Sequence, residues 1–109
     1  MAFNINELNW LKFEKDKAKG IDSKNLDSGK LLQKVSISLM KVRPGGEFST
    51  HTDPYSHFFY VLSGTGEGLH GKKVYKMEKG CGAVVKAGEV HGYKNTGKDD
   101  LYLLTMNIP

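Results

Sequence analysis

Three of the four histidines are the residues of this chain best suited to chemistry. His51 and His57 lie close together with Asp53 between them, and His91 follows much later. Each of the three stands in or beside a run with strand character, where a polar side chain is otherwise a poor choice. Taken singly, such a histidine is more often a hydrogen-bonded structural residue than a ligand. Taken together, three imidazoles and one carboxylate are a donor set that transition metals accept.

The spacing of His51 and Asp53 favours one shared site. On an extended chain, residues two apart point to the same face with their Cα atoms roughly 6.5 to 7 Å apart, so both side chains reach one ion. Pro54 ends that strand, and His57 opens the next run. The short connection predicts a neighbouring antiparallel strand that returns His57 toward the first pair. Spacing alone does not place His91 beside them.

The elements that must position these residues are short strands. From Leu31 onward, runs rich in β-branched and aromatic residues alternate with gaps that contain Gly, Pro, Asn or Asp. This pattern is typical of an all-β antiparallel sandwich or barrel. Residues 64–68 (GTGEG) are expected to form a tight hairpin turn.

The first thirty residues have a different character. Residues 3–13 form one mixed segment, and the polar stretch that follows has no period of its own. We therefore expect residues 1–30 to form an arm and a loop that pack on a barrel of residues 31–109, with Trp10 as the anchor of the arm.

Composition excludes several classes of protein. With 109 residues, 39% of them apolar and 26% charged, the chain fits one globular domain and neither a disordered nor a membrane protein. It has no apolar run long enough to span a bilayer and no signal-peptide pattern at its start. A single cysteine, Cys81, fits a reducing compartment, so we expect a cytoplasmic protein without a membrane partner.

The net charge of +4 does not indicate nucleic-acid binding. Residues 1–43 hold nine Lys or Arg and five Asp or Glu, whereas residues 44–109 hold seven of each kind. The excess lysines are mixed with acidic residues and lack clustered arginines and interleaved aromatic residues. We expect a solvated surface and no nucleic-acid partner.

The histidine segments resemble the two signature motifs of the cupin superfamily, which are small β-barrel proteins. The fixed positions of the first motif are occupied by Gly45, His51, Asp53, His57 and Gly64. Two of these residues depart from the motif, because Asp53 replaces its second histidine and His57 replaces its glutamate. The departures compensate each other, since the pocket keeps three imidazoles and one carboxylate.

The second motif supplies the remaining histidine. Its places are occupied by Gly80, Gly88, His91 and Asn95, with Lys86 in place of the usual proline. The resemblance implies an antiparallel barrel of the double-stranded β-helix, or jelly-roll, type with one metal pocket lined by both motifs. It is what places His91 beside the other ligands.

The resemblance implies metal coordination by His51, Asp53, His57 and His91. Manganese, iron or nickel is preferred, because four protein ligands around a six-coordinate ion leave two places open, whereas tetrahedral zinc would be filled. Zinc is retained as an alternative. Two other arrangements stay open: Asp53 orients a histidine ring without touching the metal, or His51, Asp53 and His91 form the facial triad of non-haem iron oxygenases with His57 as an extra residue.

Two further residues are candidates for catalysis by proton transfer. Tyr93 lies two residues after His91 and so shares its face, where it either offers a hydroxyl to a substrate or closes the pocket floor. Glu47 is assigned to the face of His51.

Alternation predicts an apolar pocket and a homodimer. Phe59 and Val61 follow His57 inward, whereas Phe58, Tyr60 and Leu62 point outward and are equally apolar. A strand that is apolar on both faces must be covered on both. The arm covers a part, and a second copy of the chain is the simplest source of the rest.

The expected function is that of a metal-binding cupin acting on a small organic molecule. We expect a metal-dependent enzyme, either of dioxygenase type or an isomerase or lyase acting on a sugar-like acid. A small-ligand-binding or sensing module without catalysis is the alternative, because the fold hosts both kinds of protein.

Overall fold

The computed structural model describes residues 2–28 and 34–109. In chain order the elements are η1 (Ile5–Glu7), β1 (Leu11–Lys12), β2 (Ala18–Ser28), β3 (Ser36–His51), β4 (Ser56–Ser63), β5 (Thr65–His70), β6 (Lys73–Glu78), β7 (Gly82–Val85), β8 (His91–Asn95) and β9 (Leu101–Ile108). Apart from the short 3₁₀ turn η1, every described element is a strand. The prediction of an all-β fold is confirmed.

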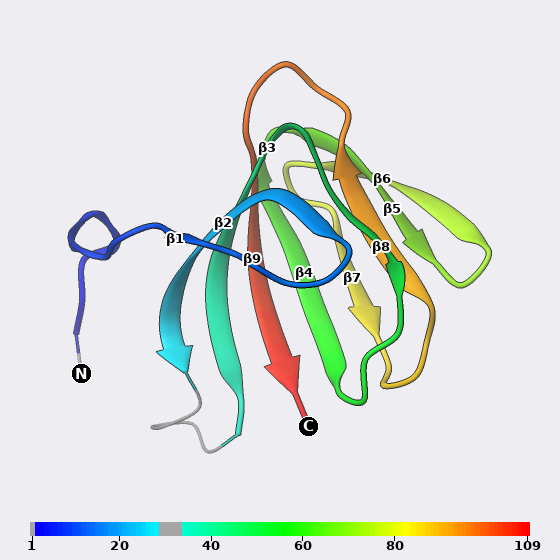
Figure 1. Cartoon of the computed structure of the whole chain (residues 1–109), viewed down its shortest axis with the longest axis horizontal. Coiled ribbons are helices and arrows are strands. Elements are labelled where there is room, and N and C mark those ends of the chain that lie inside the picture. The colour runs from blue at the N-terminus through cyan, green and yellow to red at the C-terminus, as the bar shows by residue number, and fades with distance from the viewer. Residues whose placement is uncertain (1, 29–33) are drawn as a thin grey trace.

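The strands form one curved antiparallel sheet that wraps into a nearly closed barrel (Figure 1). Their order is β6-β5-β8-β3-β9-β4-β7, with β2 on the free edge of β3 and β1 on β2. The long strand β3 joins the two halves of the barrel: residues 36–42 pair with β9, and residues 47–51 pair with β8.

The polar stretch after the arm is not a loop throughout. Residues 18–28 form β2, which pairs with β3 over most of its length. The register shifts between Lys19 and Ile21 and again between Asn25 and Asp27. These irregularities break the alternation that would otherwise mark a strand. Residues 29–33, where the expected loop ends and the expected first barrel strand begins at Leu31, lie outside the described residues.

Gly64 lies at a corner between β4 and β5, which do not pair with each other. The prediction of a hairpin turn at residues 64–68 is therefore wrong. β4 pairs with β7 and β9, whereas β5 pairs with β6 and β8. Gly64 has φ +93°, and a Cβ there would lie 2.6 Å from the carbonyl oxygen of Asp100. Only glycine meets both conditions without strain.

The core lies between the curved faces of the sheet. Among the described residues, the largest fully buried side chains are Ile21, Met77, Leu101, Leu103, Val42, Val61 and Val85. Each such side chain contributes roughly 1.5 to 3 kcal/mol when it leaves water. On the outer side, Trp10 packs against Tyr102 with ring centroids 6.1 Å apart, and the ammonium groups of Lys24 and Lys41 lie 4.7 and 4.4 Å from its ring. Trp10 therefore anchors the arm.

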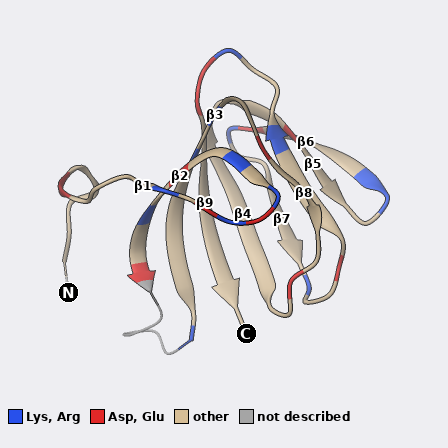
Figure 2. Ribbon diagram, viewed as in Figure 1, with Lys and Arg blue, Asp and Glu red and all other residues tan. Residues whose placement is uncertain are grey.

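The charged residues are spread over many elements, with acidic residues between basic ones (Figure 2). Among the described residues, no helix has the length and apolar character needed to cross a membrane.

Candidate metal centre

The four predicted ligands come from three separate places in the fold. His51 is the last residue of β3, and Asp53 follows it in the connection to β4. His91 is the first residue of β8, directly opposite His51 in the register of the two strands. His57 lies near the start of β4. That strand is not a neighbour of β3, contrary to the expected pairing, and reaches the site from across the barrel.

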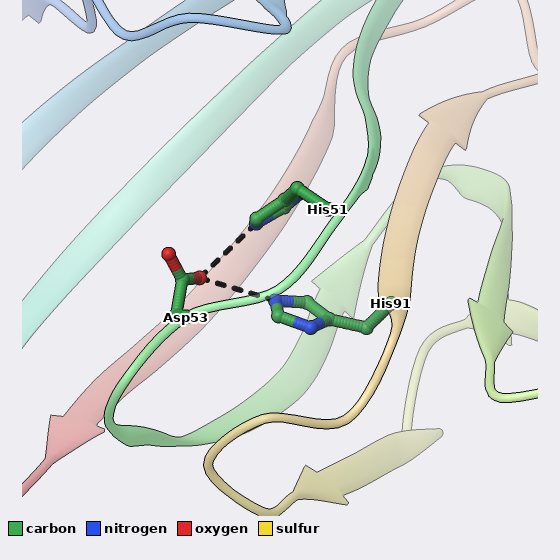
Figure 3. Close-up of side chains that lie close together, drawn as sticks. All are labelled: His51, Asp53 and His91. Atoms are coloured by element: carbon green, nitrogen blue, oxygen red, sulfur yellow. Dashed lines mark ion pairs between the residues drawn. The ribbon is translucent and has the colours of Figure 1, made fainter.

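The three imidazoles converge on one carboxylate oxygen. Oδ2 of Asp53 lies 2.7 Å from Nε2 of His57, 3.1 Å from Nε2 of His51 and 3.4 Å from Nε2 of His91. Figure 3 shows the contacts with His51 and His91. All four side chains are at most 10% exposed. The fold thus gathers the four residues that the sequence singled out.

The opposite nitrogen of each ring is held by the protein. Nδ1 lies 2.7 Å from the carbonyl oxygen of Ser49 in His51, and 2.9 Å from that of Glu89 in His91. Nδ1 of His57 lies 2.9 Å from Oδ1 of Asn107. Because main-chain carbonyls only accept, Nδ1 carries the proton in the neutral rings of His51 and His91. Their lone pairs then reside on Nε2, which faces the carboxylate, whereas Nε2 of His57 makes a 2.7 Å hydrogen bond with Oδ2 of Asp53.

This arrangement fits a divalent cation. In the described part of the chain, Nε2 of His51 and Nε2 of His91 are buried without a hydrogen-bond partner. One ligand atom from each of His51, Asp53 and His91 lies within 4.8 Å of the others. Lone pairs that face a carboxylate oxygen at such distances repel it unless a proton or a cation lies between. His57 touches the same oxygen, but it is not a member of that group of three.

The electrostatics of the pocket favour a neutral imidazole beside an ionised carboxylate. Burial raises the pKa of Asp53, but the hydrogen bond with His57 and the charges of His51 and Lys15 outweigh it, so the net shift is downward. Burial lowers the pKa of His91 below its usual value of 6.5, and the carbonyl of Glu89 opposes this only in part. Near neutral pH, His91 is therefore a free nitrogen donor.

Aromatic rings wall the site. Phe48 stacks on His51 with centroids 3.9 Å apart, and Phe59 stacks on His57 at 5.3 Å. The cavity in front of the ligands has a volume of about 80 Å³. That is room for a few water molecules, and hence for a small organic molecule. The cavity is small, as expected, but its lining is mixed, because Ser38, Thr105 and Asn107 line it together with the aromatic rings.

The structure separates the two candidates for proton transfer. Tyr93 lines the cavity, and burial raises its pKa, so its hydroxyl stays protonated and can donate but not act as a base. Glu47 is not brought to the site: it lines a different, outer groove and pairs with Lys19 at 3.2 Å. The register shift between Phe48 and His51 explains this, because one irregular step moves Glu47 to the opposite face from His51.

Three residues of the site were missed by sequence reasoning. Asn107 holds His57 from the neighbouring strand β9, fifty positions away in sequence. Lys15 and Tyr55 line the cavity from the arm and from the connection before β4. Only Tyr55 carried a signal, because it lies two residues before His57 in the same motif segment.

The remaining polar candidates lie outside this cavity. His70 pairs with Glu89 at 3.1 Å at the end of β5. Cys81 is a half-buried free thiol that packs against the core just before β7, in keeping with a structural role.

Solved structures with this architecture cover nearly the whole chain. A predicted oxalate decarboxylase from Thermotoga maritima is 25% identical with a TM-score of 0.91, and the match covers 99% of this chain and 98% of that one. The polyketide cyclase RemF from Streptomyces resistomycificus is 17% identical with a TM-score of 0.88, covering 99% and 78% of the two chains. KdgF from Halomonas sp. is 18% identical with a TM-score of 0.81, covering 98% and 92%.

Sequence comparison agrees with the structural likeness. No curated protein matches the chain. The profile of the cupin-2 family of cupin domains matches residues 38–107, which contain all four predicted ligands and most of the barrel. The chain therefore belongs to the cupin-2 family of cupin domains.

Proposed function

We propose that this cupin is a metal-dependent enzyme that acts on a small organic molecule in the cavity beside His51, Asp53, His57 and His91. The observation that carries the proposal is the convergence of three Nε2 atoms on one buried carboxylate oxygen. Among the described residues, two of these nitrogens are buried without a hydrogen-bond partner, and such atoms are costly unless something binds them.

The four residues would hold a divalent ion, with manganese, iron or nickel preferred to zinc. A bound ion of this kind supplies a Lewis acid for a substrate oxygen or, in the case of iron, a redox centre for dioxygen. The four protein groups leave open positions only on an ion that accepts more than four ligands.

The protein's own groups bind and orient the substrate. Phe48 and Phe59 exclude water from the side of the ligands, and the protonated hydroxyl of Tyr93 donates a hydrogen bond. Among the described residues that line the cavity, Asp53 is the sole carboxylate. A metal-free route that uses paired carboxylates therefore has no support here.

Reconstitution of the metal-free protein tests the reaction type. Elemental analysis of protein purified without added metal identifies the resident ion. The apo-protein is then loaded with each metal under air and under argon and offered small diols, keto acids, sugar acids and thiol acids. Turnover that needs iron and consumes oxygen selects a dioxygenase. Oxygen-independent turnover with manganese or nickel selects an isomerase or lyase.

Two variants test the site itself. The double variant His51→Ala/His91→Ala is expected to stay folded and lose the metal, whereas His70→Ala, which removes an imidazole outside the cavity, keeps it. Metal binding by the double variant would refute the proposed ligands. Tight ligand binding without turnover by any metal form would replace the enzyme with a binding module.

We further propose a cytoplasmic homodimer. The outward residues of β4 remain accessible in the single chain, with Tyr60 39% and Leu62 41% exposed, and Val84 on the adjacent β7 is 66% exposed. The arm covers a different part of this surface, around Tyr102. A second copy that covers the apolar residues is the simplest partner.

A further inference from the structure

The arm carries a lysine to the mouth of the metal cavity. Nζ of Lys15 donates a hydrogen bond to the hydroxyl of Tyr55 at 2.9 Å and lies 4.0 Å from Oδ1 of Asp53. We propose that Lys15 and Tyr55 form an anion-binding subsite, and that the substrate is a small molecule with a carboxylate at one end and an oxygen that reaches the metal at the other. This inference rests on the proposed function and names its substrate class.

The position of Lys15 is set by backbone contacts on both sides. Before it, the amide of Phe13 donates to the carbonyl of Ile21 at 3.0 Å, which attaches the segment to β2. After it, the carbonyl of Lys17 accepts from the amide of Ser49 in β3 at 2.7 Å. Lys17 itself has φ +70°, a tight-turn conformation. The lysine therefore stands on a short turn that is fixed at both ends.

Tyr55 is positioned by contacts of its ring. Its ring meets that of His57 edge-on with centroids 5.0 Å apart, and the ammonium of Lys15 lies 5.6 Å from the ring centre. The hydroxyl and the ammonium are thus adjacent donors at the entrance. The side chain of Lys15 is 44% exposed, so it keeps contact with solvent and with an entering ligand.

Charge balance asks for an anion. Among the described residues that line the cavity, Asp53 is the one acid and Lys15 the one permanent cation. A divalent ion, one carboxylate and one ammonium leave a net charge of two positive beside the aromatic walls formed by Phe48 and Phe59. An anionic substrate neutralises this charge, and the low dielectric constant of the walls strengthens the attraction.

The dimensions limit the ligand. Lys15 approaches one oxygen of Asp53, while the other oxygen lies among the histidines. The ammonium and the atoms that would hold the metal are therefore separated by little more than the width of one carboxylate. The volume of the cavity is about 80 Å³. Hydroxy or oxo acids of about three carbons fit both limits, in keeping with the volume of a few water molecules.

A simpler role for Lys15 is to balance the charge of Asp53 in the metal-free protein. The two roles differ in what is lost when Lys15 becomes methionine. If Lys15 only balances charge, its replacement changes the titration of Asp53 and leaves the choice of ligand unchanged. If Lys15 forms a subsite, its replacement by methionine removes a charge that repels the metal, so metal affinity stays equal or rises slightly. The same replacement weakens the binding of carboxylates alone.

The experiment measures binding by the metal-loaded protein. Co²⁺ serves as the probe metal because its visible absorption reports occupancy of the site. Calorimetry compares the binding of 3-hydroxypropanoate with that of its neutral analogue, 3-hydroxypropanamide. The proteins are wild type, Lys15→Met, Lys15→Arg and Tyr55→Phe. Lys12→Met is the matched control, because Lys12 is an exposed lysine of the same arm that pairs with Glu14 outside the cavity.

We expect the wild type to prefer the carboxylate to the amide by about tenfold, the worth of one partly exposed charged hydrogen bond. Lys15→Met abolishes that preference with Co²⁺ affinity retained, Lys15→Arg keeps most of it, and Lys12→Met changes nothing. Equal binding of the two probes by the wild type, or an unchanged preference in Lys15→Met, overturns the subsite. Failure of the wild type to bind Co²⁺ instead overturns the proposed metal centre.

Discussion

The exchange of Asp53 for asparagine separates coordination from orientation. Asparagine has nearly the same shape and keeps an oxygen that accepts from His57, but it loses the negative charge that faces all three imidazoles. If Asp53 only orients a ring, Asp53→Asn preserves that contact and metal affinity changes by less than about tenfold, the lower bound for loss of a supporting residue. If Asp53 coordinates the ion, an anionic ligand becomes a weak neutral one.

The structure favours the larger effect. The carboxylate is only 10% exposed and is the one acid among the described residues of the cavity, so its charge is little screened. We expect metal affinity to fall at least about a hundredfold, equivalent to about 2.7 kcal/mol. The metal affinity of Asp53→Ala, which also lacks the contact with His57, should fall further.

The assay is competition with a chromophoric chelator at fixed pH, with thermal unfolding as the check on folding. Glu14→Gln is the matched control: Glu14 is 75% exposed on the arm, and its loss removes one negative charge away from the cavity. An affinity of Asp53→Asn within about tenfold of wild type would refute coordination by Asp53 and leave a site of three histidines.

Three other perturbations have defined outcomes. Burial lowers the pKa of His91, so below pH 6.5 the unfolded chain binds a proton that the folded chain does not. The metal-free protein therefore loses stability as pH falls from 7 toward 5, with a slope of at most about 1.4 kcal/mol per pH unit. Urea titrations of His91→Gln at several pH values should give a flatter dependence of stability on pH. Phe48→Ala removes an 8% exposed ring that stacks on His51 and should cost about 3 to 5 kcal/mol in urea unfolding; a loss below about 1 kcal/mol would show that the ring is not core. Val84→Asp should give a monomer by light scattering at tens of micromolar, whereas Val74→Asp, at a valine that is 64% exposed on β6, should not; a monomeric wild type contradicts the proposed dimer.

The strand pattern made the barrel predictable, but one strand was missed for a physical reason. β2 is polar, pairs with a full-length strand on one edge only, and is broken by two register shifts. Its pairing depends on the long strand β3, a tertiary partner that no local pattern reveals. Strands β4 and β9 bury alternate residues, most of them apolar, and so carry their own signal.

The site was predictable where its residues lie in the motif segments and not where they come from elsewhere. His51, Asp53, His57 and His91 are brought together as the family resemblance implied. Glu47 was misplaced because strict alternation fails across a bulge. Lys15 and Asn107 escaped notice because each reaches the pocket through pairings with segments far away in the sequence.

The three histidines differ in how their Nδ1 atoms are anchored, and this gives them unequal tolerance to mutation. His51 and His91 are held by main-chain carbonyls, which every amino acid supplies at those positions. His57 is held by the side chain of Asn107, which a single codon change can remove. The orientation of two imidazoles is therefore fixed by the backbone, whereas that of the third depends on one side chain that a mutation can change. A substitution of Asn107 is therefore expected to reorient one imidazole of the candidate site without replacing it.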